Sequence, residues 1–421
     1  MILIFVTKIT PRIEYTFEFI FKARGVDVEL TTDKVRFLNY PGTRLNYSRV
    51  NIAGVQINPG AICFEEGCLP KEVSWSKTNP WECLSIDGVV DPVASIFYLL
   101  SRYEEYTCVH FDVHGRFPFN ESILSIGGNV EKANCDRWAN QINRFIDSAY
   151  VVGQEVVDII PTFDIDNTFA YKLKTGRRMI LSLVKDVFLG NKTRIKERSE
   201  VLNGKKDPYD TFDEIIRIST KFPGTLLFWL VGRSSKKDRN ISVENKGHQD
   251  LIKSMTKCIE VNLHPSYASN GEFKVIEAEK EVLTLITGAK ITKSRQHFLK
   301  FQLPTTYRSL INAGFSDDYS MGFAEHVGFR SGTARPHYWF DLSTNEQTSL
   351  VIHPFIYMDG TLNEYMNLSI EQSKSRVSAL YQEVLEFGGD FSFIWHNETI
   401  GDYGKWHGWS SVLTHTLKLK K

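Results

Sequence analysis

Two carboxylates stand two positions apart at the end of an apolar run in the middle of the chain. The stretch IIPTFDIDNTFAY, residues 159–171, holds Asp164 and Asp166 where a buried strand would finish. Alternate residues of a strand share one face, so both carboxylates could reach the same edge of a sheet. An Asp-x-Asp after a strand is also a common turn or helix N-cap. The functional alternative places both acids in an active site.

Polar clusters follow other predicted strands too. In a parallel α/β domain the active site lies at the carboxyl ends of the strands, so repeated placement there indicates a shared site. A single histidine is more often a hydrogen-bonded structural residue, and we treat His326, His337 and His353 in that way. The clusters are NLHPSY (262–267) with His264, SRQHF (294–298) with Arg295 and His297, IWHNE (394–398) with His396, and the loop GFRSGTARP (328–336) with Arg330 and Arg335.

Strands and helices must alternate to position these clusters. Apolar runs predict buried strands at 2–6, 156–164, 225–232, 257–267 and 391–398. Apolar residues at helical spacing predict helices at 12–24, 91–106, 135–150, 273–288 and 369–389, the second capped by Asp91 with Pro92 at its first position. The polar segment 190–210 is predicted to be an excursion with its own short helix. This order over about 250 residues favours a parallel, barrel-like α/β domain after a mixed α/β first half.

Length, charge and cysteine content limit the classes of protein to which the chain could belong. A length of 421 residues suggests two or three domains, and equal numbers of basic and acidic residues, 50 each, argue against nucleic-acid binding. The apolar start, Ile2 to Val6, is too short for a signal or a membrane span, and no other segment is long enough to cross a membrane, which predicts a cytoplasmic protein. Six scattered cysteines are not a disulfide framework; Cys63 and Cys68 have no second pair with which to bind zinc.

The four motifs, in this order, resemble those of the polysaccharide deacetylase superfamily, carbohydrate esterase family four. TFDID is similar to the first motif, EVNLHPSY to the second, GFRSG to the third and FIWHNE to the last, over roughly residues 155–421. No phosphate-binding loop, GxSxG elbow or HExxH helix is present to indicate another class. The first half, with DPVASIFYLLSRYEEY and DVHGRF, resembles an uncharacterised N-terminal domain attached to a bacterial subgroup of these proteins.

The resemblance implies a fold and an activity. We expect a distorted (β/α) barrel over 153–421 and a mixed α/β accessory domain over 1–152, in which Arg102, Glu104 and Glu105 are structural charges. The implied activity is metal-dependent hydrolysis of acetyl groups, most readily N-acetyl, on a sugar. The expected cytoplasmic location, and not the resemblance, favours a surface-glycan precursor over finished polymer as the substrate. Trp395, Trp406 and Trp409 are candidates for stacking on sugar faces or for packing.

The resemblance also assigns roles to single residues. Asp164 is the expected base, Asp166 and His264 are the expected ligands of a divalent ion, and His396 is the expected general acid. Either Arg295 or Arg330 would hold Asp164 in place or bind substrate. Zn²⁺ is the expected ion, with Co²⁺ or Ni²⁺ as alternatives.

One position departs from the family pattern. The superfamily has a second histidine four residues after the first, and here that position is Ala268. His297 is our candidate for the third ligand; alternatively it orients substrate, or the site binds metal weakly or is empty. Ala268 also keeps open a rival hypothesis, in which a catalytically inactive barrel binds a glycan or a protein partner. Hydrolysis of a non-sugar amide is a further alternative.

Overall fold

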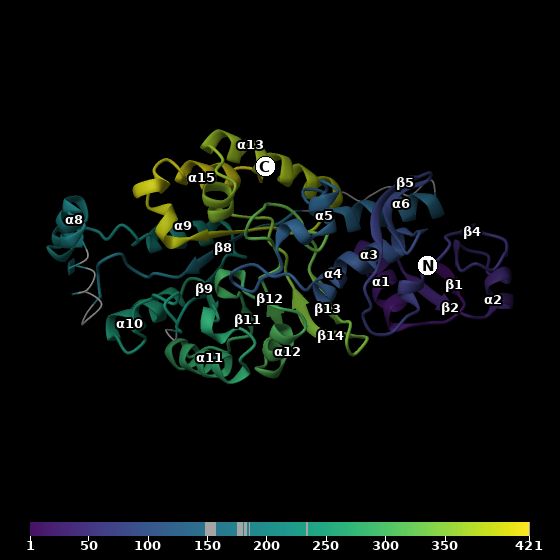
Figure 1. The fold of residues 1–421 in the computed structure, drawn as a ribbon, viewed down its shortest axis with the longest axis horizontal. Coiled ribbons are helices and arrows are strands. Elements are labelled where there is room, and N and C mark those ends of the chain that lie inside the picture. The colour runs from purple at the N-terminus through teal and green to yellow at the C-terminus, as the bar shows by residue number, and fades with distance from the viewer. Residues whose placement is uncertain (148–156, 175–179, 181–182, 185, 233–234, 421) are drawn as a thin grey trace.

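The computed structural model describes the whole chain except residues 148–156, 175–179, 181–182, 185, 233–234 and 421 (Figure 1). Residues 1–147, called the N-terminal half below, lie on one side of the molecule, and residues 157–420, the C-terminal half, lie on the other. The boundary predicted at 152/153 falls outside the described residues. Among those residues no helix is long and apolar enough to cross a membrane.

The N-terminal half contains two small sheets. The first is a four-stranded parallel sheet in the order β2-β1-β3-β4, in which helix α1 and then helix α2 connect successive parallel strands. The second is an antiparallel sheet of β5, β6 and β7. The elements are β1 (Ile2–Val6), α1 (Pro11–Phe21), β2 (Val28–Thr31), α2 (Lys34–Asn39), β3 (Arg44–Tyr47), β4 (Val55–Gln56), β5 (Val73–Thr78), β6 (Trp81–Ile86), β7 (Val89–Val90), α3 (Pro92–Leu100), α4 (Tyr103–Thr107), α5 (Ile123–Ile126) and α6 (Asn134–Ile146).

The C-terminal half is built on a curled nine-stranded sheet. Its strand order is β13-β14-β12-β11-β10-β9-β8-β16-β15, and only the β13–β14 pair is antiparallel. The strands are β8 (Ile159–Ile165), β9 (Leu226–Trp229), β10 (Glu260–Leu263), β11 (Lys293–Ser294), β12 (Asp317–Asp318), β13 (His337–Asp341), β14 (Glu346–Ile352), β15 (Tyr357–Met358) and β16 (Phe391–His396). Within the described residues β13 and β15 remain edge strands, so the expected barrel is an open half-barrel here.

Most helices of this half pack an apolar face toward the sheet, whereas α8 lies apart from it (Figure 1). The helices described in this half are α8 (Lys192–Leu202), α9 (Phe212–Lys221), α10 (Lys246–Met255), α11 (Phe273–Thr287), α12 (Thr305–Asn312), α13 (Ile370–Phe387), α14 (Asn397–Ile400) and α15 (Ser410–Leu417). The helices predicted at 273–288 and 369–389 are thus confirmed. The first ends at Gly288 in a left-handed conformation, and the second begins with a capping box of Ser369 and Gln372. The predicted short helix of segment 190–210 is α8.

The single helix predicted over 91–106 is wrong. The structure has two helices there, α3 and α4, because Arg102 between them adopts a left-handed conformation with φ of 54°. The Asp91 cap and Pro92 are as predicted. The helix predicted at 135–150 is α6, which ends at Ile146; residues 148–150 lie outside the described part.

Buried ion pairs join the two halves. Glu105 of the N-terminal half binds Arg102 at 2.7 Å and Arg330 of the C-terminal half at 2.8 Å, and all three side chains are at most 3% exposed. Arg335 reaches Asp136 at 2.9 Å in the same interface. Apolar residues of the C-terminal half, Phe323 and Phe340 among them, belong to the hydrophobic core of the N-terminal half. The halves are therefore packed as one body.

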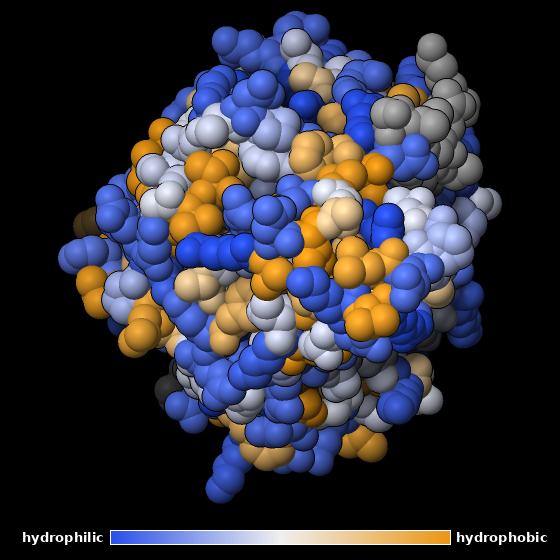
Figure 2. Space-filling view, turned by 90° about the vertical axis from the view of Figure 1, so that its right-hand side faces the viewer, coloured by the Kyte–Doolittle hydropathy of each residue, from blue (hydrophilic) through white to orange (hydrophobic). Residues whose placement is uncertain are grey.

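The outer face of the N-terminal half is mixed in character. Seen from that side, hydrophobic residues are interspersed with hydrophilic ones (Figure 2). The apolar content of this half is instead concentrated in its core, which includes the fully buried Ile4, Phe21 and Phe97.

We predict that Glu105→Ala destabilises the protein by about 3–5 kcal/mol, because it leaves buried guanidinium groups without their shared carboxylate. The matched control is Glu18→Ala, whose ion pair with Lys22 is solvent-exposed and should contribute less than about 1 kcal/mol. Denaturant unfolding followed by tryptophan fluorescence measures both. Equal losses in the two variants would contradict the structural role of the buried pair.

Candidate metal and catalytic site

Five predicted site residues lie at the carboxyl ends of the parallel strands. Asp164 is in β8, where its register partner on β16 is His396. Asp166 follows β8 by one residue and His264 follows β10 by one residue. His297 begins a short helical turn three residues after β11. Parallel strands end at one edge of a sheet, which is why residues far apart in sequence meet here.

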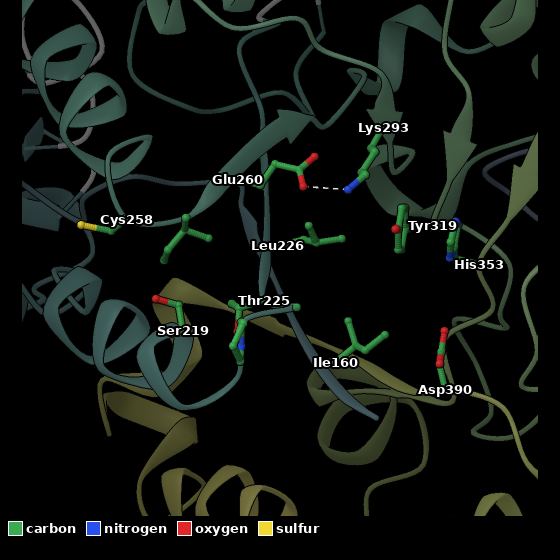
Figure 3. A pocket seen from close by; sticks show the side chains of 13 residues that line it. Ile160, Ser219, Thr225, Leu226, Cys258, Glu260, Lys293, Tyr319, His353 and Asp390 are labelled. Carbon is green, nitrogen blue, oxygen red and sulfur yellow. Dashed lines mark hydrogen bonds and ion pairs between the residues drawn. The ribbon is translucent and has the colours of Figure 1, made fainter. Parts of the chain in front are cut away.

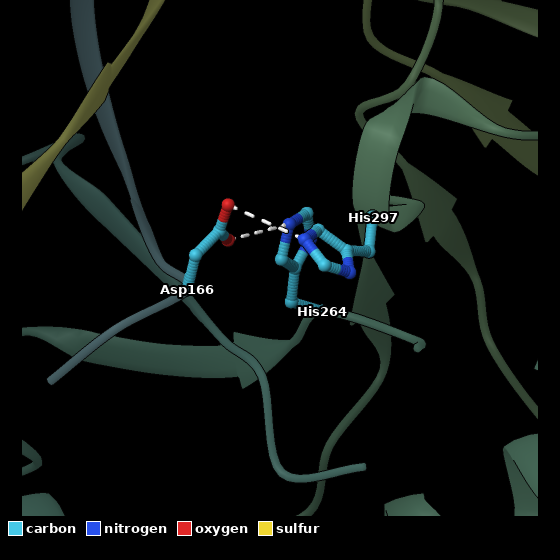
Figure 4. A group of neighbouring side chains, drawn as sticks. All are labelled: Asp166, His264 and His297. Carbon is cyan, nitrogen blue, oxygen red and sulfur yellow. Dashed lines mark ion pairs between the residues drawn. The ribbon is translucent and has the colours of Figure 1, made fainter. Parts of the chain in front are cut away.

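Asp166, His264 and His297 form a compact group (Figure 4). The Nε2 atom of His264 lies 3.2 Å from Oδ1 of Asp166, and the Nε2 atom of His297 lies 3.3 Å from Oδ2. One ligand atom from each of the three residues lies within 4.8 Å of the others. Oδ1 of Asp166 is buried and has no hydrogen-bond partner among the described residues.

The outer nitrogens of both imidazoles are already bound. Nδ1 of His264 contacts the backbone carbonyl of Arg295, which can only accept a hydrogen bond, so Nδ1 carries a proton. Nδ1 of His297 donates to Asp238 at 2.9 Å. This fixes both rings with Nε2 facing Asp166. A neutral imidazole so held presents a lone pair, and two lone pairs beside a carboxylate fit a divalent cation.

Without such a cation, protons stabilise the carboxylate. Burial raises the pKa of Asp166, but the imidazoles of His297 and His264 outweigh it and hold that pKa well below the usual value. Burial lowers the pKa of His297, but Asp166 and Asp238 outweigh it and raise that pKa to about 9. The site therefore attracts positive charge.

Asp164 is held by an arginine from the same strand end as His297. Nη1 of Arg295 donates to Oδ1 of Asp164 at 2.8 Å, and neither side chain is more than 4% exposed. Nε of Arg295 donates to the carbonyl of Tyr319 at 3.0 Å, and its guanidinium lies 4.3 Å from the Phe228 ring centroid. Of the two arginines considered for this role, Arg295 is the one that reaches Asp164.

His396 faces the group from the other side. Its Nδ1 donates to Oδ1 of the fully buried Asp359 at 2.8 Å, and its Nε2 lies 3.7 Å from Asp166. Burial lowers the pKa of His396, but Asp359 and then Asp166 outweigh it and raise that pKa well above the usual value. His396 thus holds a proton on Nε2 in the metal-free protein.

These side chains open onto a cavity of about 230 Å³. Trp406 lines it, whereas Trp395 is fully buried and Trp409 packs edge-on against Trp406 at 5.7 Å. Only Trp406 of the three tryptophans is thus placed to contact a ligand here. The lining is Arg116, Asp164, Asp166, His264, Gln296, Phe298, Leu299, Ala324, Met358, Asp359, Gly360, Glu364, Tyr365, His396, Glu398, Thr399 and Trp406.

Arg330 does not join this group. Its guanidinium is bound by Glu105 and lies 4.4 Å from the Phe301 ring centroid, so it supports the interface between the halves and does not contact Asp164. His326 stacks on Phe119 at 4.5 Å. Burial lowers the pKa of His337 to about 4.

A larger cavity of about 430 Å³ lies at the opposite ends of the strands (Figure 3). It is lined by residues that begin strands, such as Ile160, Leu226 and the ion-paired Glu260 and Lys293. His353 borders it, paired with Asp317 at 2.8 Å. None of the predicted site residues lines this cavity.

Three residues at the site were not predicted from the sequence. Asp359 follows the short strand β15 and precedes Gly360, a strand-end signal that could have been recognised. Asp238 lies nine residues beyond β9, where no local pattern marks it. Arg116 comes from the N-terminal half and reaches the cavity only through tertiary packing.

Comparison with known families gives one match. A model described as a family of unknown function (DUF7033) matches residues 2–151. No curated protein matches the chain.

Several solved structures resemble the chain at low identity. A protein from Mycobacterium smegmatis described as a putative polysaccharide deacetylase is 12% identical, with 64% of this chain and 87% of that chain covered and a TM-score of 0.40. Puue allantoinase is 13% identical, with 62% and 82% covered and a TM-score of 0.36. The polysaccharide deacetylase from Bacillus cereus is 10% identical, with 62% and 86% covered and a TM-score of 0.28. The chemistry of the site, not these likenesses, carries the functional proposal below.

We predict that chelator-treated protein loses stability as pH rises from about 6.5 to about 9. The pKa of His297 is raised on folding from 6.5 to about 9, so its stabilisation is complete below pH 6.5 and is lost as pH rises through 9. At about 1.4 kcal/mol per pH unit, a rise of about 2.5 units corresponds to a loss of about 3.5 kcal/mol. Urea unfolding at several pH values measures it. His297→Gln should flatten the slope and His326→Gln should keep it; an unchanged slope in His297→Gln would refute this assignment.

Proposed function

We propose that this protein is a metal-dependent hydrolase that removes acetyl groups, N-acetyl foremost, from a sugar or a surface-glycan precursor. The observation that carries the proposal is the pair of imidazoles whose Nδ1 atoms are bound and whose Nε2 atoms face Asp166. Two imidazole nitrogens and one carboxylate that converge on one point are a donor set that fits a divalent cation. The neighbouring Asp164 and His396 add a base and an acid within the same cavity.

Asp166, His264 and His297 would hold the ion. One carboxylate and two imidazoles suit Zn²⁺, and also Co²⁺ or Ni²⁺, and three protein ligands leave a position open for reactants. When bound, such an ion supplies Lewis acidity, polarising a carbonyl and lowering the pKa of water. His297 would take the part of the histidine that Ala268 replaces; Ala268 lies in a short turn at 267–269.

Asp164 and His396 would divide the proton transfers. Arg295 binds Oδ1 of Asp164, which leaves Oδ2 to take a proton from the attacking water. Asp359 fixes the ring of His396 and favours its protonated form, so Nε2 can give a proton to the departing amine. An amine leaves only when protonated, which makes this acid necessary for amide cleavage. Separate partners thus position one group to accept a proton and the other to donate one.

The cavity favours a small reacting unit. Its volume of about 230 Å³ is below the roughly 300–1,000 Å³ of pockets that enclose drug-sized ligands. A single acetylated sugar would enter while the rest of the substrate stays outside. Trp406 on the wall offers an aromatic face for that sugar.

We predict that Asp166→Ala and His264→Ala each abolish tight divalent-ion binding, measured by titration calorimetry with Zn²⁺. His297→Ala should weaken binding by at least tenfold, since it removes the third ligand. His353→Ala, in the cavity at the opposite strand ends, is the matched control and should bind as the wild type does. A wild type that binds no divalent ion at millimolar concentration would favour the rival, an inactive barrel that binds a glycan or a partner.

We predict that Asp164→Asn keeps the ion but lowers the rate of acetate release by about a hundredfold or more, because the base is lost. Acetate release from an N-acetylated sugar oligomer, with calorimetry on the same preparation, measures both properties. His396→Gln should likewise retain the ion and lose rate. Full activity in either variant would overturn the assigned proton transfers.

A further inference from the structure

A loop of the N-terminal half is built against the mouth of the catalytic cavity. Nη1 of Arg116 donates to the carbonyl of Phe298 at 3.0 Å, and Nε2 of Gln302 donates to the carbonyl of Gly115 at 2.8 Å. Nδ1 of His114 lies 3.2 Å from the hydroxyl of Tyr267. The segment 112–116 is therefore held beside the cavity, and its residue Arg116 lines it, although the segment lies outside the strands that carry the other site residues.

The loop has a defined conformation. The carboxylate of Asp112 accepts hydrogen bonds from the backbone N–H groups of His114 and Arg116, both at 2.8 Å. It also accepts one from Nε of Arg116 at 2.7 Å, so the guanidinium is fixed where it lines the cavity. An arginine held on its Nε side by one carboxylate still presents N–H groups to a ligand.

The segment that this loop touches is itself unusual. Phe298 and Leu299 have φ values of 63° and 51°, and both line the cavity directly after His297. Non-glycine residues in this conformation are strained and are found where the surroundings hold them in place. The bond from Arg116 to the Phe298 carbonyl is one of these restraints.

Two lysines extend positive charge outward from Arg116. Nζ of Lys237 lies 5.4 Å from the Phe298 ring centroid, and Nζ of Lys300 lies 4.1 Å from that of Tyr267. The rings of Phe298 and Tyr267 have centroids 5.4 Å apart, and both pack on the ring of His114, so both lysines lie against one aromatic cluster beside Arg116. Within the described part of the chain neither lysine has an ion-pair partner. The chain as a whole has zero formal net charge, so this cluster of positive side chains is a local feature of the surface.

We propose that Arg116, Lys237 and Lys300 bind an anionic group of the substrate, so that the enzyme acts on an acetylated sugar that carries a phosphate or a carboxylate. The inference deepens the proposed function and rests on it for the acetyl group, but the anion site stands on its own contacts. The buried, doubly held Arg116 would orient the anion at the cavity wall. The lysines would attract it from solution, with an effect that salt screens.

Kinetics with three substrates tests the proposal: N-acetylglucosamine phosphate, an N-acetylated uronic acid and uncharged N-acetylglucosamine, each with Zn²⁺-loaded enzyme. The expected KM is at least tenfold lower for a charged sugar than for the neutral one. Comparison of the first two identifies phosphate or carboxylate as the preferred anion. Raising NaCl should reduce the preference.

Matched variants locate the effect. The double variant Lys237→Gln/Lys300→Gln should raise KM for the charged sugar about tenfold and leave KM for the neutral sugar unchanged. Arg116→Gln, which also removes a restraint on Phe298, should raise KM for the charged sugar about tenfold more than it raises KM for the neutral sugar. The control Lys253→Gln/Lys257→Gln removes the same charge near helix α10 and should change neither. Zn²⁺ calorimetry on each variant verifies that the metal site is intact.

The outcomes separate this proposal from the proposed function. Acetate release with equal KM for charged and neutral sugars would overturn the anion site and leave the hydrolase intact. If wild type releases no acetate from any sugar, calorimetric binding of the same three sugars decides. If wild type binds a charged sugar more tightly than the neutral one, and the Lys237→Gln/Lys300→Gln variant does not, the anion site is upheld and the hydrolase is rejected. Binding with no such preference would reject both.

Discussion

Two carboxylates at one strand end need separate counter-charges, and the other residues of the site supply them. Asp164 near the end of β8 pairs with Arg295, and Asp166 just beyond β8 pairs with His297; Arg295 and His297 follow β11 by one and three residues. The arginine neutralises the first carboxylate permanently. The imidazole neutralises the second in a way that a proton or a cation can replace.

The three histidines of the site have different hydrogen-bond partners at Nδ1. This atom contacts a backbone carbonyl in His264, Asp238 in His297 and Asp359 in His396. A buried carboxylate raises the pKa of His297 and of His396, whereas the backbone carbonyl fixes only the orientation of the His264 ring. The three histidines around Asp166 are thus held by different outer partners.

Much of the site could be predicted from local patterns because parallel strands deliver their ends to one edge. Asp164, Asp166, His264, His297 and His396 each carry a strand-end signal and do meet. Arg330 lies in a similar polar motif, but its side chain pairs with Glu105 and not with the site. Arg116 lines the cavity although no sequence motif marks it. Both cases depend on packing between halves that the sequence does not encode locally. The break at Arg102 has the same origin, since its side chain binds Glu104, Glu105 and the carbonyl of Arg330.

The shared carboxylate of Glu105 also constrains how this molecule can change over generations. It satisfies one arginine from each half, so a change on either side leaves a buried charge that only a compensating change on the other can relieve. If recombination joined the C-terminal half to a different N-terminal half, Arg330 would lose its carboxylate partner and remain buried against Phe301 and Phe323. The two halves are therefore expected to evolve together. Substitutions at Arg102, Glu105 and Arg330 should occur in correlated sets.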